Sequence, residues 1–588
     1  MGTSVRRPWE TATVLDQALL DQSQDSLSQG LDMIVDVYAV DGVKRWSDGA
    51  KYVDSVFYEN RVEFPTIERT IGEFLSGELI FSGLEITVGN TDKLYSNILP
   101  GGNAYDGWIN RRVEVKIGLL ELGSSYVTLF DGFVTDIGGF SRDVSTFTLT
   151  CRNKFDSVNV SIPNQVLLDT DFPDIEDEFI GLAVPVIYGD WTTDLRIEKI
   201  NGLNAQVAAV PAFPVNGLDP LVNASLDPVD PGAGNTPLRL VFSSTPIKTL
   251  DTATVTLSRG DLFYLFAPGD IAIVPLTNNT VFDITQKNLF IDGSPWIYES
   301  GDTFFVKCVG VELSGGTYDS NIVEQSRDLL ERFGGLISSD FTAEWDYFRD
   351  KNAPPQSAIA NIPARVWFQD TSKLIDLVAA LLEQVRLEPY INRLNKWALN
   401  SLHFDEFEAA PAFVVKNWDV GKGSFAFQID ERNNFNRATA DFDFNPAIGE
   451  SRFSTPIFRN DLAITQAGKQ ISKKIVFPNL YKIDDVQDQL IEMIRLVSGY
   501  SEFATVKLTS RAFLKDISDF VQLSIDIGSV EFSSTGSPIV GMIRDLSYDP
   551  TTMGINAKIW LFQMLNFPGY TGPTGTVSGY NQSITQET

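Results

Sequence analysis

Paired carboxylates are the residues of this chain whose types and spacing could do chemistry. They occur within the run Asp174–Glu178, at Glu406 and Glu408, and at Asp484 and Asp485. Two carboxyl groups about 5–10 Å apart across a cleft can hydrolyse a glycosidic bond, one as the acid and the other as base or nucleophile. Proximity in sequence does not supply a cleft, and an acidic run is more commonly a solvated loop. We therefore assign no catalytic residue.

The single histidine limits the other kinds of site that this chain could build. His403 stands between Ser401 and Asp405 in an alternating stretch that predicts a strand end, where neighbours two apart share a face without forming a triad. Cys151 and Cys308 are too far apart for a zinc knuckle, and we expect both to be buried. No phosphate-binding loop, zinc-protease motif or full calcium loop occurs. We predict a non-enzymatic chain without a metal or a cofactor.

Aromatic side chains are numerous, with 40 Phe, 17 Tyr and 10 Trp. Trp191 and Trp296 fall in or near loops between predicted strands, where exposed rings could form a platform for sugars. Burial in sheet cores or in subunit contacts is the commoner fate of such rings. A multi-domain glycan-binding or glycoside-hydrolysing β protein of a virion or cell surface therefore stays open as the alternative function.

The composition excludes several classes of protein. A chain of 588 residues, with 43% hydrophobic and 21% charged residues, is long enough for about three to five packed domains. The net charge of −31 argues against wrapping DNA or RNA, because phosphate binding needs clustered Lys and Arg. No apolar run approaches the length of a membrane-spanning helix, and we expect no secretory signal because the N-terminus lacks an apolar core. We predict a folded, acidic chain without membrane insertion.

Hydrophobic periodicity begins with a helical pattern and continues with strands. Residues 1–30 predict a polar helical arm whose apolar side, with Val14, Leu15 and Leu19, could dock on a neighbour. Residues 31–160 alternate short β-branched and aromatic runs with Gly, Asn and Asp, which is typical of a β-barrel or a β-sandwich. The first two segments are therefore a docking arm and a first β domain.

The remaining segments alternate between β-rich and helix-bearing patterns. Residues 161–319 predict an inserted β domain, interrupted by a proline-rich loop at 209–237. Residues 320–429 predict a helix-bearing α+β domain, because apolar residues recur at helical spacing behind a capping box. Residues 430–566 predict a second β domain that includes one long helix, and the Gly-, Thr- and Ser-rich tail 567–588 is predicted to be flexible.

Two hairpins near opposite ends of the chain resemble each other. Gly132–Ile137 and Gly541–Leu546 share the order Gly, apolar, apolar, polar, Asp, apolar, and an alternating strand precedes each, at 111–119 and 519–527. Short hairpins can look alike by chance, but the match favours two copies of one β domain. The predicted fold class is mainly β with an α+β middle region. It contains two related tube-like β-barrel domains, an inserted β domain and a helix-bearing domain.

In this order of domains the sequence resembles the tail-tip or baseplate hub proteins of tailed bacteriophages. The segments that carry the resemblance are 129–154, 183–190, 320–335, 372–384 and 537–550. The family tends to show a strand that ends in Pro-x-apolar-Tyr-Gly, and Pro185–Gly189 matches it. The pattern covers residues 30–200 and 320–566, whereas the insert 200–319 and the C-terminal tail fall outside it.

The resemblance implies a structural protein. Hub proteins of this family are homotrimers, in which two tube-like domains per chain give six around the axis and adapt a sixfold tail tube to a threefold tip. Contacts are implied with the distal tail or tail tube protein, with the tape-measure protein and with central spike or fibre proteins. DNA would pass through the ring without specific binding. The implied location is the tail tip of the virion, after assembly in the cytoplasm of the bacterial host.

The two alternating strands at 111–119 and 519–527 are candidates for the wall of the ring. The candidate interface residues are Val113, Val115, Ile117, Val521, Leu523 and Ile525. Three copies carry a charge of −93, three times the −31 of one chain, and acidic walls let DNA pass without holding its phosphates. Solubility is the alternative reason for this acidity. The sequence does not say which acids face inward.

Overall fold

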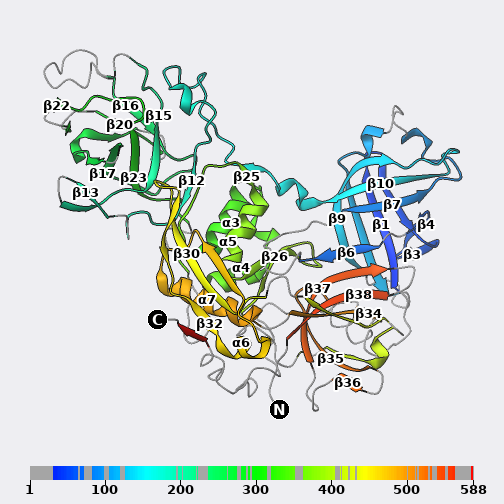
Figure 1. The fold of residues 1–588 in the computed structure, drawn as a ribbon. Coiled ribbons are helices and arrows are strands. Elements are labelled where there is room, and N and C mark those ends of the chain that lie inside the picture. The colour runs from blue at the N-terminus through cyan, green and yellow to red at the C-terminus, as the bar shows by residue number, and fades with distance from the viewer. Residues whose placement is uncertain are drawn as a thin grey trace.

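The computed structural model arranges the chain in two adjoining β domains, a helix-bearing centre and a separate β domain at one end (Figure 1). It describes residues 31–562 and 584–586 except for 64–65, 72–82, 99–104, 120–125, 194–196, 201–202, 220–221, 223–235, 261, 275–279, 286–288, 292–293, 314–318, 351–361, 404–410, 412, 422–423, 431–433, 499–500, 510–511, 513–514, 528–529, 533–538 and 550–553. The predicted docking arm, with Val14, Leu15 and Leu19, lies outside the described residues.

The first β domain is a curved nine-stranded sheet in the order β3-β4-β2-β1-β8-β9-β10-β7-β5. Alternating side chains build it, and in β7 the apolar Leu84, Ile86 and Val88 are all buried. The strands are β1 (Leu31–Ala39), β2 (Gly42–Ser47), β3 (Lys51–Val53), β4 (Val56–Asn60), β5 (Val62–Glu63), β7 (Leu84–Gly89), β8 (Arg112–Leu119), β9 (Tyr126–Gly138) and β10 (Thr146–Asn153).

The inserted β domain has a sheet and a core of its own, in the order β18-β17-β23-β15-β16-β20-β19. Aromatic rings fill this core, including Phe266, Trp296 and Phe304. Its sheet contains β15 (Val210–Pro214), β16 (Leu238–Val241), β17 (Thr249–Arg259), β18 (Leu262–Leu265), β19 (Ile271–Ile273), β20 (Val281–Ile284) and β23 (Thr303–Val309). Two hairpins flank it, β13 (Ile197–Ile200) with β14 (Leu203–Gln206) and β21 (Phe290–Ile291) with β22 (Ser294–Pro295).

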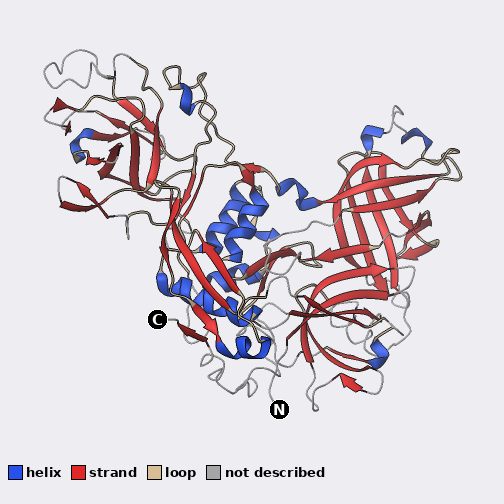
Figure 2. Cartoon of the chain, viewed as in Figure 1, coloured by secondary structure: helices blue, strands red, loops and turns tan. Residues whose placement is uncertain are grey.

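All α-helices of the described residues lie in the centre of the molecule (Figure 2). They are α3 (Ile322–Arg332), α4 (Ala343–Asp350), α5 (Leu374–Glu383), α6 (Asp461–Ala467) and α7 (Ile483–Val497). The predicted N-cap of α3 is confirmed, because the Asn321 side chain accepts hydrogen bonds from the amides of Val323 and Glu324. Buried apolar faces of α3, α5 and α7 form one core with neighbouring strands.

Strands surround these helices. The central sheet joins β30 (Arg437–Asn445), β31 (Glu450–Ser454), β32 (Phe458–Asn460), β33 (Ser472–Phe477) and β39 (Ile584–Gln586). Three two-stranded pairs complete the region: β11 (Ser161–Ile162) with β25 (Ser372–Lys373), β12 (Val186–Tyr188) with β24 (Val366–Phe368), and β26 (Leu387–Ile391) with β27 (Trp397–Ser401). The last pair is the predicted hairpin with its turn near Asn395, which has a φ of 53°.

The second β domain is an eight-stranded sheet with β28-β35-β37-β38-β34-β29 as its main path. Its strands are β28 (Val414–Lys416), β29 (Ala426–Asp430), β34 (Ser501–Leu508), β35 (Phe520–Ile527), β36 (Val530–Phe532), β37 (Ile539–Asp549) and β38 (Gly554–Phe562), joined by β6 (Ile67–Thr70). Apolar residues of both β domains belong to one continuous core. The two domains therefore pack directly against each other.

Sheet pairing corrects several predicted boundaries. The inserted domain, predicted as 161–319, loses β11 and β12 to the central region, and the predicted proline-rich loop 209–237 begins with β15, a strand inside the inserted sheet. Strands between residues 414 and 430 join the second β domain and not the helix-bearing one, whereas residues 434–498 belong to the central region. In the tail, which was predicted to be flexible, residues 584–586 pair with β32. Periodicity identifies a strand but not the sheet that it joins, because the partners are distant in sequence.

The predicted fold class is confirmed, since the described residues are mainly strands around one helix-bearing centre. Within that part of the chain, no helix is long and apolar enough to cross a membrane.

Candidate functional site

The two β domains share the order of six strands. The first sheet contains the order β1-β8-β9-β10-β7-β5 and the second the order β28-β35-β37-β38-β34-β29. When the six strands of each sheet are numbered by their order along the chain, both sheets have the spatial order 1-4-5-6-3-2. They differ at one outer strand, since β1 is antiparallel to β8 whereas β28 is parallel to β35. The two β domains thus share a strand order, as predicted, but β28 and β29 lie before residue 430, where the second domain was predicted to begin.

The repeated hairpin sequences lie at the same place in the two sheets. In each repeat the glycine, Gly132 in β9 or Gly541 in β37, and the two residues after it stay in register, and the pairing then shifts by one. The extra residue of this β-bulge is Thr135 in β9 and Arg544 in β37. The polar position of the repeated pattern is thus the bulged one, and the aspartate that follows it resumes the pairing.

The turn that enters this strand pair is also repeated. Asn110 and Ser518 both have positive φ angles, of 60° and 72°. The Asn110 amide donates to the carbonyl of Val134 at 2.8 Å, and the Ser518 amide donates to the carbonyl of Ile543 at 2.8 Å. Strand order, bulge and turn therefore agree, which indicates a duplicated domain.

Strand β6 ties the two copies together. It leaves the first β domain between β5 and β7 and pairs antiparallel with β37, with Thr70 opposite Asp545 and Ile67 opposite Tyr548. It continues the line of β35, which pairs with the earlier part of β37. The Thr70 hydroxyl donates to the Asp545 carboxylate, and the Ile71 amide donates to the carbonyl of the bulged Arg544 at 3.2 Å.

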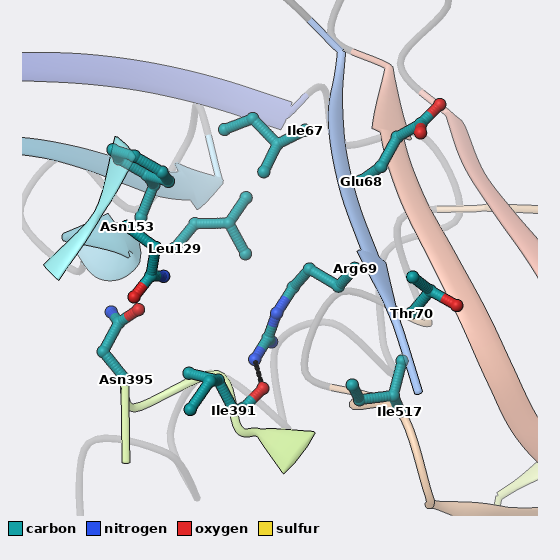
Figure 3. A pocket seen from close by; sticks show the side chains of 10 residues that line it. Ile67, Glu68, Arg69, Thr70, Leu129, Asn153, Ile391, Asn395 and Ile517 are labelled. Atoms are coloured by element: carbon teal, nitrogen blue, oxygen red, sulfur yellow. Dashed lines mark hydrogen bonds between the residues drawn. The ribbon is translucent and has the colours of Figure 1, made fainter. Parts of the chain in front are cut away.

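The side chain of Arg69 extends from β6 to the central region (Figure 3). Its Nη1 donates to the Asp516 carboxylate at 2.8 Å, and its Nη2 donates to the carbonyl of Ile391 at 2.6 Å. Asp516 also accepts a hydrogen bond from the Arg393 amide. Burial raises the pKa of Asp516, and the adjacent Arg69 opposes that shift. The first β domain, the second and the β26–β27 hairpin thus meet at one guanidinium group.

A second buried charge pair lies nearby, between the bulge and the hairpin. Arg544 makes a bidentate contact with Glu388 of β26, with Nη2 3.0 Å from Oε1. The Asn400 side chain donates to the same carboxylate at 2.9 Å. In the second repeat, the β-bulge therefore orients the Arg544 side chain toward the central region.

Neither of two hollows in the described part of the chain is lined by two carboxyl groups. The one drawn in Figure 3, lined by Arg69, Asn153 and Asn395, has a volume of about 30 Å³, enough for a water molecule. A larger hollow of about 400 Å³ lies between α5, β33 and α7 and is mostly apolar. Its carboxyl group, Glu383, has a pKa raised by burial, but one carboxyl does not make an acid and base pair.

The six candidate ring-wall residues lie in the protein core. Every one of these side chains is at most 4% exposed and belongs to the core shared by the two β domains: Val113, Val115, Ile117, Val521, Leu523 and Ile525. The prediction that they meet a neighbouring subunit is therefore wrong, because each strand turns its apolar side inward and leaves its polar side outward.

The polar side of β8 is not a bare acidic surface. The Glu114 carboxylate accepts a hydrogen bond from the Tyr38 hydroxyl and lies 3.2 Å from the Lys116 ammonium. Burial alone would raise the pKa of Glu114, but these partners outweigh burial and lower the pKa. Neighbouring acids are paired in the same way, as Asp32–Lys51, Asp36–Lys116 and Asp131–Arg112. This face of the first β domain is therefore a network of balanced charges.

The other residues singled out from sequence are also structural. Glu176 accepts a hydrogen bond from Tyr298, and both are buried. His403 is buried and contacts Arg386 at 2.8 Å, and burial lowers the pKa of Arg386 to about 10. Glu406 and Glu408 lie outside the described residues, whereas Asp484 and Asp485 lie in the first turn of α7.

Trp191 and Trp296 are each at most 2% exposed, so the interpretation of these rings as an exposed platform for sugars is wrong. Their indole N–H groups bind Tyr188 and Asp302 inside the fold. Both cysteines are buried, as predicted. Among the described residues, no group of three potential metal ligands occurs.

Comparison with known proteins gives likeness of fold alone. No protein-family model and no curated protein matches the chain. The tail protein from Neisseria meningitidis MC58 is 9% identical with a TM-score of 0.36, over 90% of this chain and 96% of that one. The 43 kDa tail protein of prophage MuSo2 from Shewanella oneidensis is 10% identical with a TM-score of 0.37, over 91% and 99%. A chain of the native gene transfer agent virion is 9% identical with a TM-score of 0.35, over 66% and 86%.

Proposed function

We propose that this chain is the structural hub of a bacteriophage tail tip, a homotrimer that adapts a sixfold tail tube to a threefold tip. The observation that carries the proposal is the duplication: two β domains with one strand order, the same bulge and the same turn, joined by β6. Three such chains supply six similar domains. A closed ring of three copies thereby offers a sixfold face without a second gene product.

The construction of the junction supports a mechanical role. Buried ion pairs and a shared core hold the two β domains to each other and to the centre. A ring that transmits force between tube and tip needs such rigid coupling. The inserted β domain projects at the far end of the molecule from the two β domains (Figure 1), where it is free to contact other tip components.

The partners in this proposal follow from the position in the tail. The face of the six β domains meets the distal tail or tail tube protein, and the tape-measure protein ends inside the ring. Central spike or fibre proteins attach on the opposite side. DNA passes through the bore during ejection, and the excess of acidic residues keeps its phosphates from binding.

Labelling of whole particles tests this location. The epitope is inserted at Gly49, between β2 and β3, where an added Cβ would have no neighbour within 4 Å. Antibody bound at the end of the tail, on the tail axis, is the expected image. Label on the head, along the tail or only on peripheral fibres would contradict the proposal.

Glycoside hydrolysis, the alternative function, is tested by direct assay. The purified chain is expected to leave peptidoglycan and polysaccharides intact, because the only buried acid of the 174–178 run, Glu176, is held by Tyr298. Turnover that disappears in Asp174→Asn or Glu176→Gln would establish an active site in that run and overturn the structural assignment.

A further inference from the structure

The duplication leaves one difference between the two repeats that concerns assembly. In the second repeat, β35 covers the first part of one edge of β37, and β6 covers the rest from Asp545 to Tyr548. In the first repeat, β8 covers the matching first part of β9, up to Phe133. The backbone of Thr135–Gly138 on the side away from β10 is here called the β9 edge. Among the strands that the structure describes, none pairs with it.

The β9 edge matches its filled counterpart in local geometry. In the first repeat, the Val134 amide donates to the carbonyl of Arg111, and the Val134 carbonyl accepts from the amide of Asn110. In the second repeat, Ile543 makes the same two hydrogen bonds with Asp519 and Ser518. Beyond this point β37 receives β6, while β9 continues to Gly138, with Asp136 and Gly139 exposed. The Asp136 carboxylate accepts the Tyr105 hydroxyl at 3.2 Å, as Asp545 accepts that of Thr70. The Asp136 carboxylate also accepts the amide of Ile137 at 2.8 Å, whereas β6 supplies the strand partner at the corresponding Leu546 in the second repeat.

We infer that a second copy of this chain adds a strand to the β9 edge. The inference rests on the proposed trimer and names the contact that closes it. Within one chain, the first β domain gives a strand to the second. If the repeats alternate around a ring, the second β domain must meet the first β domain of the next copy at the equivalent place. Such head-to-tail contacts close when the rotation closes, and they cover strand edges that otherwise aggregate.

Hydrogen exchange on the full chain tests this contact, together with the mass of the species in solution. Dilution to the monomer should leave fast those amides of 135–138 that do not face β10, and assembly should slow them about tenfold or more, as strand pairing does. The amides of 545–548 are the internal control, since β6 protects them in both states. A trimer with unchanged exchange at 135–138 overturns the inference and leaves the proposed function standing. A chain that stays monomeric at every concentration overturns both.

A charged side chain at the same edge provides an independent test. A Cβ at Gly138 would meet only the Asp136 carboxylate, at 3.8 Å, so Gly138→Lys fits the folded monomer. Lysine on an edge blocks strand addition, and we expect the trimer dissociation constant to rise about tenfold or more. Gly49→Lys, at a position with no neighbour within 4 Å, is the matched control and leaves assembly unchanged. Equal assembly of the two variants, both folded by circular dichroism, contradicts the inference.

Discussion

Single buried charges hold the domains of this chain together. Arg544 meets Glu388 across 156 positions of sequence, and Arg69 meets Asp516 across 447. Neither pair could be predicted from the sequence, because a lone arginine in a strand pattern does not reveal a partner on another domain. In the acidic run 174–178, which did stand out, Glu176 is bound by Tyr298 and the other acids are exposed. The sequence signal that could have drawn attention to Arg544 was its position in the repeated hairpin, where the first copy has Thr135.

Removal of Arg544 should destabilise the junction more than removal of an exposed arginine. Arg544→Ala leaves the Glu388 carboxylate buried without its cation, which costs about 3–5 kcal/mol in comparable pairs. Arg152→Ala breaks an exposed pair with Asp156 and should cost about 1 kcal/mol or less. Urea unfolding followed by tryptophan fluorescence measures both. Equal losses in the two variants would show that the buried pair does not stabilise the junction.

Acid should weaken the first β domain through Asp92. Hydrogen bonds from Arg61 lower the pKa of this carboxyl from its usual 3.8 to about 2. Because the folded pKa is depressed, the contribution is complete above pH 3.8 and is lost as the pH falls through about 2. The urea midpoints of the native chain and of Asp92→Asn should differ at pH 6 and converge near pH 2. A difference that persists at pH 2 would rule out this linkage.

At the scale of elements, periodicity predicted the strongest segments and missed the weakest. Helices α3, α5 and α7 and the hairpin β26–β27 agree with the pattern of apolar residues. Helices α4 and α6 and strand β6 were missed, since eight residues or fewer carry too little periodic signal. The boundary errors have a different cause. Residues 434–498 form strands and two helices, of which only α7 was predicted, and long-range contacts assign them to the centre.

The repeated glycines should be intolerant of a side chain. At Gly541 a Cβ would lie 2.7 Å from the carbonyl oxygen of Trp560 on β38, and at Gly132 it would collide with that of Arg152 on β10. Alanine at either position forces the paired strands apart, at a cost of about 1–3 kcal/mol. Gly49→Ala, in open space, is the control. Thermal unfolding of the three variants measures the effect, and unchanged melting of Gly132→Ala and Gly541→Ala would remove the packing reason for the repeat.

The C-terminal strand should matter for assembly more than for folding. Deletion of 567–588 removes β39 from β32 and the contact of Ile584 with the central core, but leaves every other described strand pair. The far-ultraviolet circular dichroism should therefore stay near that of the full chain, while the fraction of trimer falls. Deletion of residues 587–588 alone is the control. An unchanged trimer fraction after the longer deletion would reduce the tail to an appendage.

At the scale of the whole molecule, duplication connects the fold to the proposed hub. Two copies of one β domain lie side by side with a common core, and the strand that joins them belongs to the sheet of the second copy. The repeat could be recognised in the sequence, but the residues predicted to form the ring contact are buried. Strand edges, which no residue pattern marks, are the better candidates for contacts between copies.

The oligomeric state of the purified full-length chain tests the central claim most directly. Mass photometry gives the number of 65.1 kDa chains per particle, and averaged electron micrographs of the same sample give the symmetry. The account predicts a trimer that appears as a ring with six similar lobes around an open centre. A monomer at all concentrations, a hexamer, or a trimer without six lobes around its axis would contradict it.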